Sequence, residues 1–283
     1  MKSASVFSGR NTLSSGFTLV ELLVAMTLGL LISYFVSDIL VASNRNSSVS
    51  RDLSQAQEAG RFAISFLNRS LMKAGYGPDG ALDQPYEPLC SGSAGMCTTD
   101  SSSNDTGDRI AIRRTATTEN NLSCQNTNLG VADGTEVTDV FWVEDVDGTP
   151  TLICRTYDSL NATPITSAES LVSGVEALQA LYGISLCDPT ETGSRNVSTY
   201  LSATEIDSPP SSFSSATCPD GSSAQVSWQR VYAVKIAVLT RAADPTSGAA
   251  TERGYTLLDA APYSFDDRYT RQVFSTTVTR ANY

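Results

Sequence analysis

A long apolar run near the start of the chain constrains the fold more than any other feature. It extends from Phe17 to about Ala42. At a rise of about 1.5 Å per residue, a helix of this length crosses a hydrocarbon core about 30 Å thick. Between Gly16 and Val36 the one charged side chain is Glu21, and an ionisable group at bilayer depth indicates a functional site with a partner. The run therefore predicts a single membrane-spanning helix that carries a functional carboxylate near its start.

The residues before this run are polar and include Lys2 and Arg10. Such basic residues hold the amino end of a membrane helix on the cytoplasmic side. A secretory signal has its small cleavage residue after the apolar core, whereas here Gly16 precedes the core. Cleavage after Gly16 would leave the apolar helix in the mature protein, which would then begin at Phe17.

The short basic leader, Gly16, the aromatic Phe17 and a glutamate at the fifth position after the cut together resemble the class III leader of type IV prepilins and pseudopilins. The resemblance implies cleavage by a membrane prepilin peptidase, N-methylation of Phe17, and a Glu21 that neutralises the N-terminal ammonium of a neighbouring subunit during assembly. In hydrocarbon the two charges satisfy one another, whereas each alone is strongly disfavoured. A plain signal anchor with an incidental glutamate is the alternative.

Composition narrows the possible functions. Acidic residues outnumber basic ones by 30 to 19, which argues against nucleic-acid binding because phosphate contacts need basic patches. The chain contains no His, so catalysis that relies on imidazole is excluded. No lysine lies in a phosphate-binding glycine loop and no dinucleotide fingerprint is present. Adjacent acids such as Glu144 with Asp145 and Asp266 with Asp267 are typical of solvated loops. We expect a structural or interaction protein with no catalytic residues and no cofactor.

All six cysteines follow the apolar run. An even number in the part that would be exported predicts disulfides formed in an oxidising periplasm. A zinc site is the weaker interpretation because the chain lacks His and a close C-x-x-C pair, so we expect no metal. Many pairings are possible, and we expect sequence neighbours to pair because two such pairs close loops of low core content. The expected disulfides are Cys90–Cys97, Cys124–Cys154 and Cys187–Cys218.

Helical character continues after the apolar run. Apolar residues recur every three or four positions from Val49 to Leu67 among polar ones, as in an amphipathic helix. A glycine and a proline in 74–78 predict its end. The apolar stripe is expected to dock on a sheet, and binding of a partner is the alternative. The polar residues between the apolar ones are Arg51, Asp52, Gln55, Glu58, Arg61 and Arg69.

The remainder of the chain predicts an antiparallel sheet. Asp145-Val146-Asp147-Gly148 is a hairpin turn signal, and it lacks the further acidic ligands of a calcium loop. The last two predicted strands are expected to be central in one sheet. Two segments rich in turn residues, 79–108 and 187–218, predict surface loops. The predicted strands are 108–113, 137–143, 151–156, part of 171–184, 231–240 and 271–280.

Several of these segments occur in an order that resembles the PilW family of type IV minor pilins. The resemblance implies a pilin-like α+β fold in which the second half of a long N-terminal helix packs on an antiparallel sheet with disulfide-tied loops. The segments that carry it are Gly60-Arg61-Phe62-Ala63, Ala74-Gly75-Tyr76, the stretch from Gly174 to Gly183, the strand from Val231 to Arg241 and the ending from Arg271 to Arg280. The expected parts are a cleaved leader (1–16), a transmembrane and filament-core helix (17–42), the amphipathic second half of the helix (43–76) and a periplasmic pilin-like β domain (77–283).

The same resemblance implies a minor pilin that promotes initiation and assembly of a type IV pilus, in a tip or priming complex. The implied partners are other minor pilins, the major pilin, the prepilin peptidase and the inner-membrane assembly platform, with a tip adhesin as a further candidate. The protein would cross the inner membrane once, with its C-terminal domain in the periplasm, and then join the pilus on the cell surface. Two alternatives stay open: a pseudopilin of a type II secretion system, and a surface adhesion module whose Ser/Thr-rich loops bind a ligand.

Overall fold

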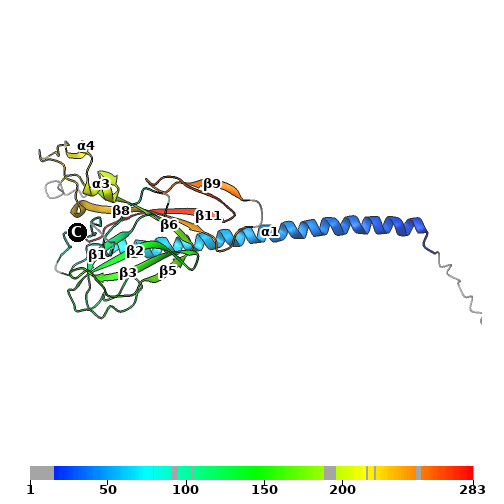
Figure 1. The fold of residues 1–283 in the computed structure, drawn as a ribbon, viewed down its shortest axis with the longest axis horizontal. Coiled ribbons are helices and arrows are strands. Elements are labelled where there is room, and N and C mark those ends of the chain that lie inside the picture. Colours follow the sequence, from blue (N-terminus) through cyan, green and yellow to red (C-terminus); the bar gives the residue numbers. More distant parts are fainter. Residues whose placement is uncertain are drawn as a thin grey trace, which may run out of the picture. The chain divides into compact units, whose positions relative to one another are not determined.

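The structure is a computed structural model that describes residues 16–78, 80–90, 95–103, 105–187, 196–214, 216–219, 221–246 and 250–282. The chain divides into two compact units, Met1–Ser47 and Ser48–Tyr283. In its described part the first unit is the beginning of helix α1 (Leu19–Met72), and the second unit holds the rest of α1 and all the described strands (Figure 1). Apart from Gly16, the predicted leader lies outside the described residues.

Helix α1 is 54 residues long. All residues described in the first unit are exposed. Among the described helices, α1 alone is long and apolar enough to cross a membrane, and its most apolar window has a mean hydropathy of 2.2. The expected continuation of one helix from the apolar run into the amphipathic half is therefore present.

The second half of α1 buries one face. The buried positions recur every three or four residues, as an amphipathic helix requires. One of them, Asp52, was expected on the polar face. The helix contacts the sheet at Thr240, whose hydroxyl donates to the Ala56 carbonyl oxygen at 2.9 Å. The buried residues are Asp52, Ala56, Gly60, Ala63, Leu67 and Leu71.

The helix ends at Met72, slightly before the predicted stop. Gly75 adopts φ +72°, a left-handed conformation that glycine tolerates. The backbone N–H of Gly75 then donates to the Arg113 carbonyl at 2.8 Å. This bond turns the chain from the end of the helix onto the edge of a sheet.

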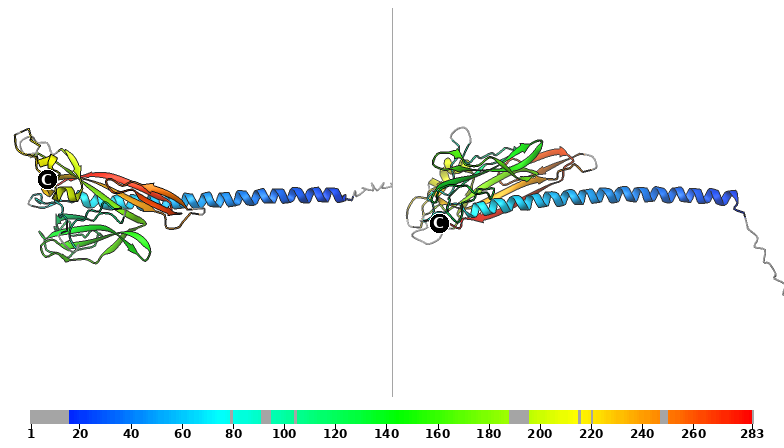
Figure 2. Two further views of the ribbon diagram at one scale, coloured as in Figure 1. Left: turned by 45° about the horizontal axis from the view of Figure 1, so that its top comes forward. Right: turned by 90° about the horizontal axis from the view of Figure 1, so that it is seen from below.

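Two antiparallel sheets and a separate hairpin follow the helix (Figures 1 and 2). In the five-stranded sheet the order is β1-β2-β3-β4, and β5 also pairs with β3. In the four-stranded sheet the order is β11-β8-β6-β7. The separate hairpin consists of β9 paired with β10. The strands of the first sheet are β1 (Ile110–Thr115), β2 (Glu136–Val146), β3 (Thr149–Asp158), β4 (Thr163–Pro164) and β5 (Glu169–Ser173). The others are β6 (Val175–Ile184), β7 (Thr199–Leu201), β8 (Val231–Arg241), β9 (Thr251–Tyr255), β10 (Tyr263–Asp267) and β11 (Arg271–Thr279).

The sheet order corrects one expectation. Strand β8 is central, but β11 is an edge strand. The sequence pattern could not distinguish an edge strand from a central one. One face of β11 packs on α1, so β11 has the same alternation as any half-buried strand. Gly174 explains why the predicted segment 171–184 forms β5 and β6 in different sheets. It has φ +84°, and a Cβ there would lie 2.8 Å from the Arg241 carbonyl oxygen.

The main core is formed by α1 and the two larger sheets, and it includes Leu67, Phe141 and Ile236. A second cluster packs Leu257 and Tyr263, from the β9–β10 region, against Leu239 of β8. In β8 the residues of the two clusters alternate, so the hairpin region covers the face opposite α1.

Three disulfides join Cys90–Cys97, Cys124–Cys154 and Cys187–Cys218, the same pairs that the sequence predicted. The segment between the last two cysteines is more ordered than the expected surface loop. It contains β7 and two short helices, α3 (Ala203–Asp207) and α4 (Ser211–Ser214). Leu201, Ala203 and Ile206 belong to the main core, so this part of the insertion is packed against the domain.

Candidate functional site

The predicted assembly residues lie at the start of α1. Thr18 and Glu21 form a reciprocal capping box. The backbone N–H and the hydroxyl of Thr18 each donate to Glu21 Oε2 at 3.0 Å, and the Glu21 N–H donates to Thr18 Oγ1 at 3.2 Å. The carboxylate of Glu21 is thereby held over the first turn, where free backbone N–H groups favour negative charge.

Gly16 and Phe17 directly precede this capping box, and the Phe17 side chain is 89% exposed. A cut after Gly16 would create an ammonium group one residue before Thr18. The sequence pattern was not used to predict Thr18 as the partner of Glu21. The signal was present, because Thr18-Leu19-Val20-Glu21 is the S/T-x-x-E/Q pattern of a capping box before an apolar run.

The first unit also presents a continuous apolar surface. Isolated exposed apolar side chains are ordinary, but a large contiguous patch marks a protein or membrane contact. Gly29 lies within the unbroken helix, and a Cβ there would meet no other atom within 4 Å. This half of α1 can therefore bind lipid or other apolar helices along its length. The exposed large apolar residues include Leu19, Val20, Leu22, Leu23, Met26, Leu30, Ile32, Tyr34, Phe35 and Ile39.

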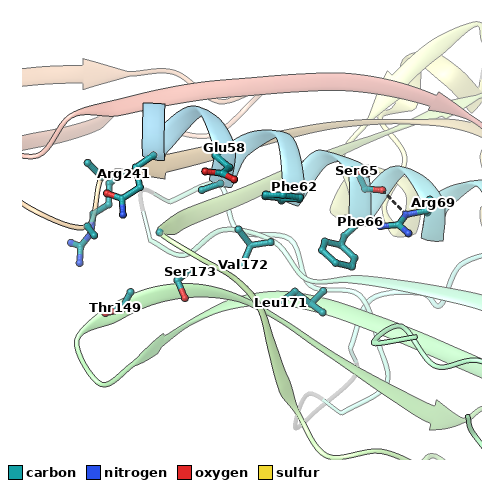
Figure 3. A pocket seen from close by; sticks show the side chains of 15 residues that line it. Glu58, Phe62, Ser65, Phe66, Arg69, Thr149, Leu171, Val172, Ser173 and Arg241 are labelled. Carbon is teal, nitrogen blue, oxygen red and sulfur yellow. Dashed lines mark hydrogen bonds between the residues drawn. The ribbon is translucent and has the colours of Figure 1, made fainter. Parts of the chain in front are cut away.

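In the second unit a groove of about 630 Å³ lies beside the buried face of α1. Phe62 and Phe66 on the helix face Val172 and Leu171 on β5 (Figure 3). Phe62 is 52% exposed. The predicted stripe from Val49 to Leu67 therefore serves two surfaces: part of it docks on the sheet as expected, and Ala59 and Phe66 line the groove.

Charged side chains border this groove. The Arg69 guanidinium lies 5.0 Å from the centre of the Phe66 ring. Arg241 lies at 3.4 Å from Glu176 Oε1, and Glu58 is exposed on the helix. The groove thus combines an apolar floor with a polar rim, the general anatomy of a protein contact.

A charged cluster around the buried Arg271 joins β11 to β6 in the four-stranded sheet and to β10 in the hairpin. Arg271 at the start of β11 contacts Glu176 Oε2 at 2.5 Å and Asp267 Oδ1 at 2.6 Å. Its guanidinium also lies 3.6 Å from the centre of the Phe265 ring. Burial lowers the pKa of Arg271, but the hydrogen bonds that its guanidinium donates to Asp267 and Glu176 outweigh this effect and leave the pKa raised. The same arginine lowers the pKa of Asp267, and its ion pair with Glu176 anchors β11 to β6.

Asp108 is a second buried acid, 4% exposed, just before β1. Its two oxygens accept from the backbone N–H groups of Ser101 and Ala180, each at 2.8 Å. Burial nevertheless raises the pKa of Asp108 to about 8. The residue links the segment before β1 to β6, and it lines a small polar pocket of about 390 Å³.

The adjacent acids considered for catalysis have different partners in the structure. Glu144 accepts a hydrogen bond from the Trp142 indole at 2.9 Å, and Asp267 belongs to the Arg271 cluster. Asp147 and Gly148 have positive φ in the β2–β3 turn, as a hairpin of this kind requires. Among the residues described, no group of three or more acidic or cysteine side chains is placed to hold a metal ion.

Comparisons with known proteins match two parts of the chain. The profile of the family described as Type IV Pilus-assembly protein W matches residues 140–282, and that of the prokaryotic N-terminal methylation motif matches residues 12–33. The type IV-like pilin TTHA1219 from Thermus thermophilus is similar in structure, with a TM-score of 0.44 and 14% identity over 79% of this chain and 94% of that chain. A search of curated proteins found no match. Because the first profile spans half of the chain, and the second covers its amino-terminal motif, the chain belongs to the PilW family of type IV pilus-assembly proteins.

Proposed function

We propose that this protein is a minor pilin that initiates assembly of a type IV pilus from a position at or near the filament tip. Prepilin peptidase would cut it after Gly16, and Phe17 would be N-methylated. The mature protein would cross the inner membrane once, with its β domain in the periplasm, before it enters the pilus. Its partners would be other minor pilins, the major pilin and the assembly platform.

The observation that carries this proposal is the exposed apolar half of α1 with Glu21 at its start. No residue in the most apolar window of the helix is buried within the protein. This surface must therefore be covered by lipid or by apolar surfaces of other molecules. The bundled helices of a filament and the bilayer both provide such a medium. Glu21 would then neutralise the ammonium of a neighbouring subunit, since an unpaired charge there is disfavoured.

The size of the second unit supports the tip position. Most of the 283 residues belong to it, and the disulfide-tied segments 90–97 and 187–218 add bulk to it. In a close-packed helical shaft each neighbour would have to accommodate that bulk. A subunit at the tip has neighbours on one side only.

Deletion of the gene and labelling of filaments test the proposal together. We expect the deletion strain to lose most or all surface pili while the major pilin stays in the membrane. Antibodies to the segment 187–218 should label filament ends in the parent strain. Uniform labelling along the shaft, or normal piliation of the deletion strain, would contradict the tip role. Normal piliation with loss of protein secretion would favour a type II pseudopilin.

A further inference from the structure

The two larger sheets protect most of their edges. Free edges expose unpaired backbone groups, so native proteins cover, shorten or interrupt them. The outer edge of β1 is covered by the segment before it. The backbone N–H of Arg113 donates to the Pro85 carbonyl at 2.9 Å, and the backbone N–H of Glu87 donates to the Ala111 carbonyl at 3.0 Å. Strand β5 is short and its pairing with β3 has a register shift. Strand β7 has three residues.

Strand β11 has none of these protections. It is nine residues long, and its register with β8 is unbroken from Arg271 to Thr279. It contains no proline or glycine, and between Arg271 and Arg280 it contains no charge. Its Val, Phe and Thr residues have high β propensity. Within the described part of the chain, β11 is thus the one long, regular and uncharged edge of the larger sheets.

The hydrogen-bond pattern shows which groups face outward. The backbone N–H of Arg280 donates to the Tyr232 carbonyl at 2.8 Å, and the backbone N–H of Ala242 donates to the Thr270 carbonyl at 2.9 Å. Because bonded pairs alternate along an antiparallel ladder, the even-numbered residues of β11 bond to β8 and the odd-numbered ones point their N–H and C=O groups away from it. Within the described residues, these outward groups have no backbone partner outside the sheet. They belong to Val273, Ser275, Thr277 and Thr279.

We propose that the edge of β11 from Val273 to Thr279 binds an extended, uncharged strand of another pilin subunit. A row of alternating donors and acceptors that repeats about every 7 Å is matched by another extended backbone and by no helix or side-chain patch. The absence of charge from 272 to 279 fits a partner strand that is itself uncharged, because a charged strand would lie beside apolar Val273 and Phe274. The Arg271 cluster fixes the start of the edge, so the row is rigid before binding.

The identity of the partner as a pilin subunit rests on the proposed function. The inference that the edge of β11 binds a strand does not. Residue-resolved hydrogen exchange separates the two. The full chain in detergent micelles is compared with the same chain recovered from sheared filaments and from mildly solubilised membranes. We expect the amides of Val273, Ser275 and Thr277 to exchange at least tenfold more slowly in an assembled pool than in micelles. The amides of 274, 276 and 278, already bonded to β8, serve as the internal control and should change much less.

The outcomes are distinguishable. Protection of the outward amides in membrane complexes, with no protein in filaments, supports strand addition and contradicts the proposed function. Protein in filaments with outward amides that exchange as fast as in micelles contradicts strand addition and leaves the proposed function intact. Equal slowing of outward and inward amides indicates general stabilisation of the sheet and also contradicts strand addition.

A matched pair of variants at one position adds an independent test. Thr277→Pro removes an outward N–H and leaves the bonds to β8 in place, as proline on a sheet edge allows. Thr277→Ala keeps that N–H. We expect the proline variant to be recovered with its partner complex at least fivefold less than the alanine variant, with the three disulfides intact in both. Equal recovery of the two folded variants would overturn the proposal.

Discussion

Phe17 and Glu21 are the residues through which the first unit would act. Phe17 precedes the capping box and is almost fully exposed. Cleavage after Gly16 would place a charged amino group close to the Glu21 carboxylate. Mass spectrometry of the N-terminal peptide should find N-methylated phenylalanine as the first residue. An intact Met1, or a cut after the apolar run, would show that the leader is not processed as proposed.

Replacing Glu21 should separate insertion from assembly. Glu21→Ala makes the helix more apolar, so membrane insertion should be unchanged. Incorporation into filaments should fall about tenfold or more, equivalent to at least about 1.4 kcal/mol, because a neighbouring ammonium loses its partner. Fractionation and shearing of filaments measure the two effects. Asp38→Ala, an exposed carboxylate on the same helix, is the control and should assemble normally. Equal incorporation of both variants would exclude the proposed role of Glu21.

Asp108 predicts a pH dependence of stability in the second unit. Burial raises the pKa of Asp108 from 3.8 to about 8, so the folded protein favours the protonated form. Stability from this residue is fully present below about pH 4 and is lost as the pH rises to about 8. Urea unfolding of the parent should show a loss of more than about 1 kcal/mol between pH 5 and pH 8, the equivalent of one pKa unit.

Asp108→Asn provides the comparison, because asparagine keeps the shape of the side chain and does not titrate. Its unfolding free energy should change less than that of the parent over the same pH range, whatever its absolute value. Other acids, such as the partly buried Glu87 with its raised pKa, titrate in both proteins and cancel in the difference. Parallel pH profiles would show that Asp108 ionises normally.

At the scale of elements, the contact between α1 and β11 depends on a glycine. A Cβ at Gly60 would overlap the Phe274 ring. Gly60→Ala should therefore destabilise the protein by about 1–3 kcal/mol through overpacking, although alanine favours the helix by about 1 kcal/mol. In a Phe274→Ala background the same change should become neutral or stabilising. Urea unfolding of the four proteins gives the coupling, and independent effects of the two changes would rule out this contact.

Most helices and strands could be predicted from local sequence patterns, and the elements that were predicted wrongly or missed have physical causes. The strands β1, β2, β3 and β8 lie within a few residues of their predicted positions because alternation and the Asp-Gly turn are local signals. The β9–β10 hairpin was missed because β9 is exposed at four of its five positions and shows no alternation of burial, and β10, which does alternate, is only five residues long. The edge position of β11 depends on long-range pairing, and the groove depends on α1 meeting β5. No local pattern encodes either arrangement.

At the scale of the whole molecule, the two units differ in what stabilises them. All described buried residues lie in the second unit, as do the three disulfides. A chain that begins at Ser48 should therefore stay folded in water without detergent. We expect a melting temperature within a few degrees of that of the full chain in micelles and complete disulfides by peptide mapping. Aggregation or free thiols would show that the first unit is needed for folding.

The exposed apolar half of α1 also determines whether assembly can be reversed. Lipid tails and apolar helices are about equally nonpolar, so movement of this segment from bilayer to filament changes its hydrophobic free energy little. Entry into water, in contrast, is strongly unfavourable. In the proposed filament, this subunit at the tip would return to the bilayer intact once the rest of the filament had been disassembled. The same copy could then be used in many rounds of growth and retraction without new synthesis.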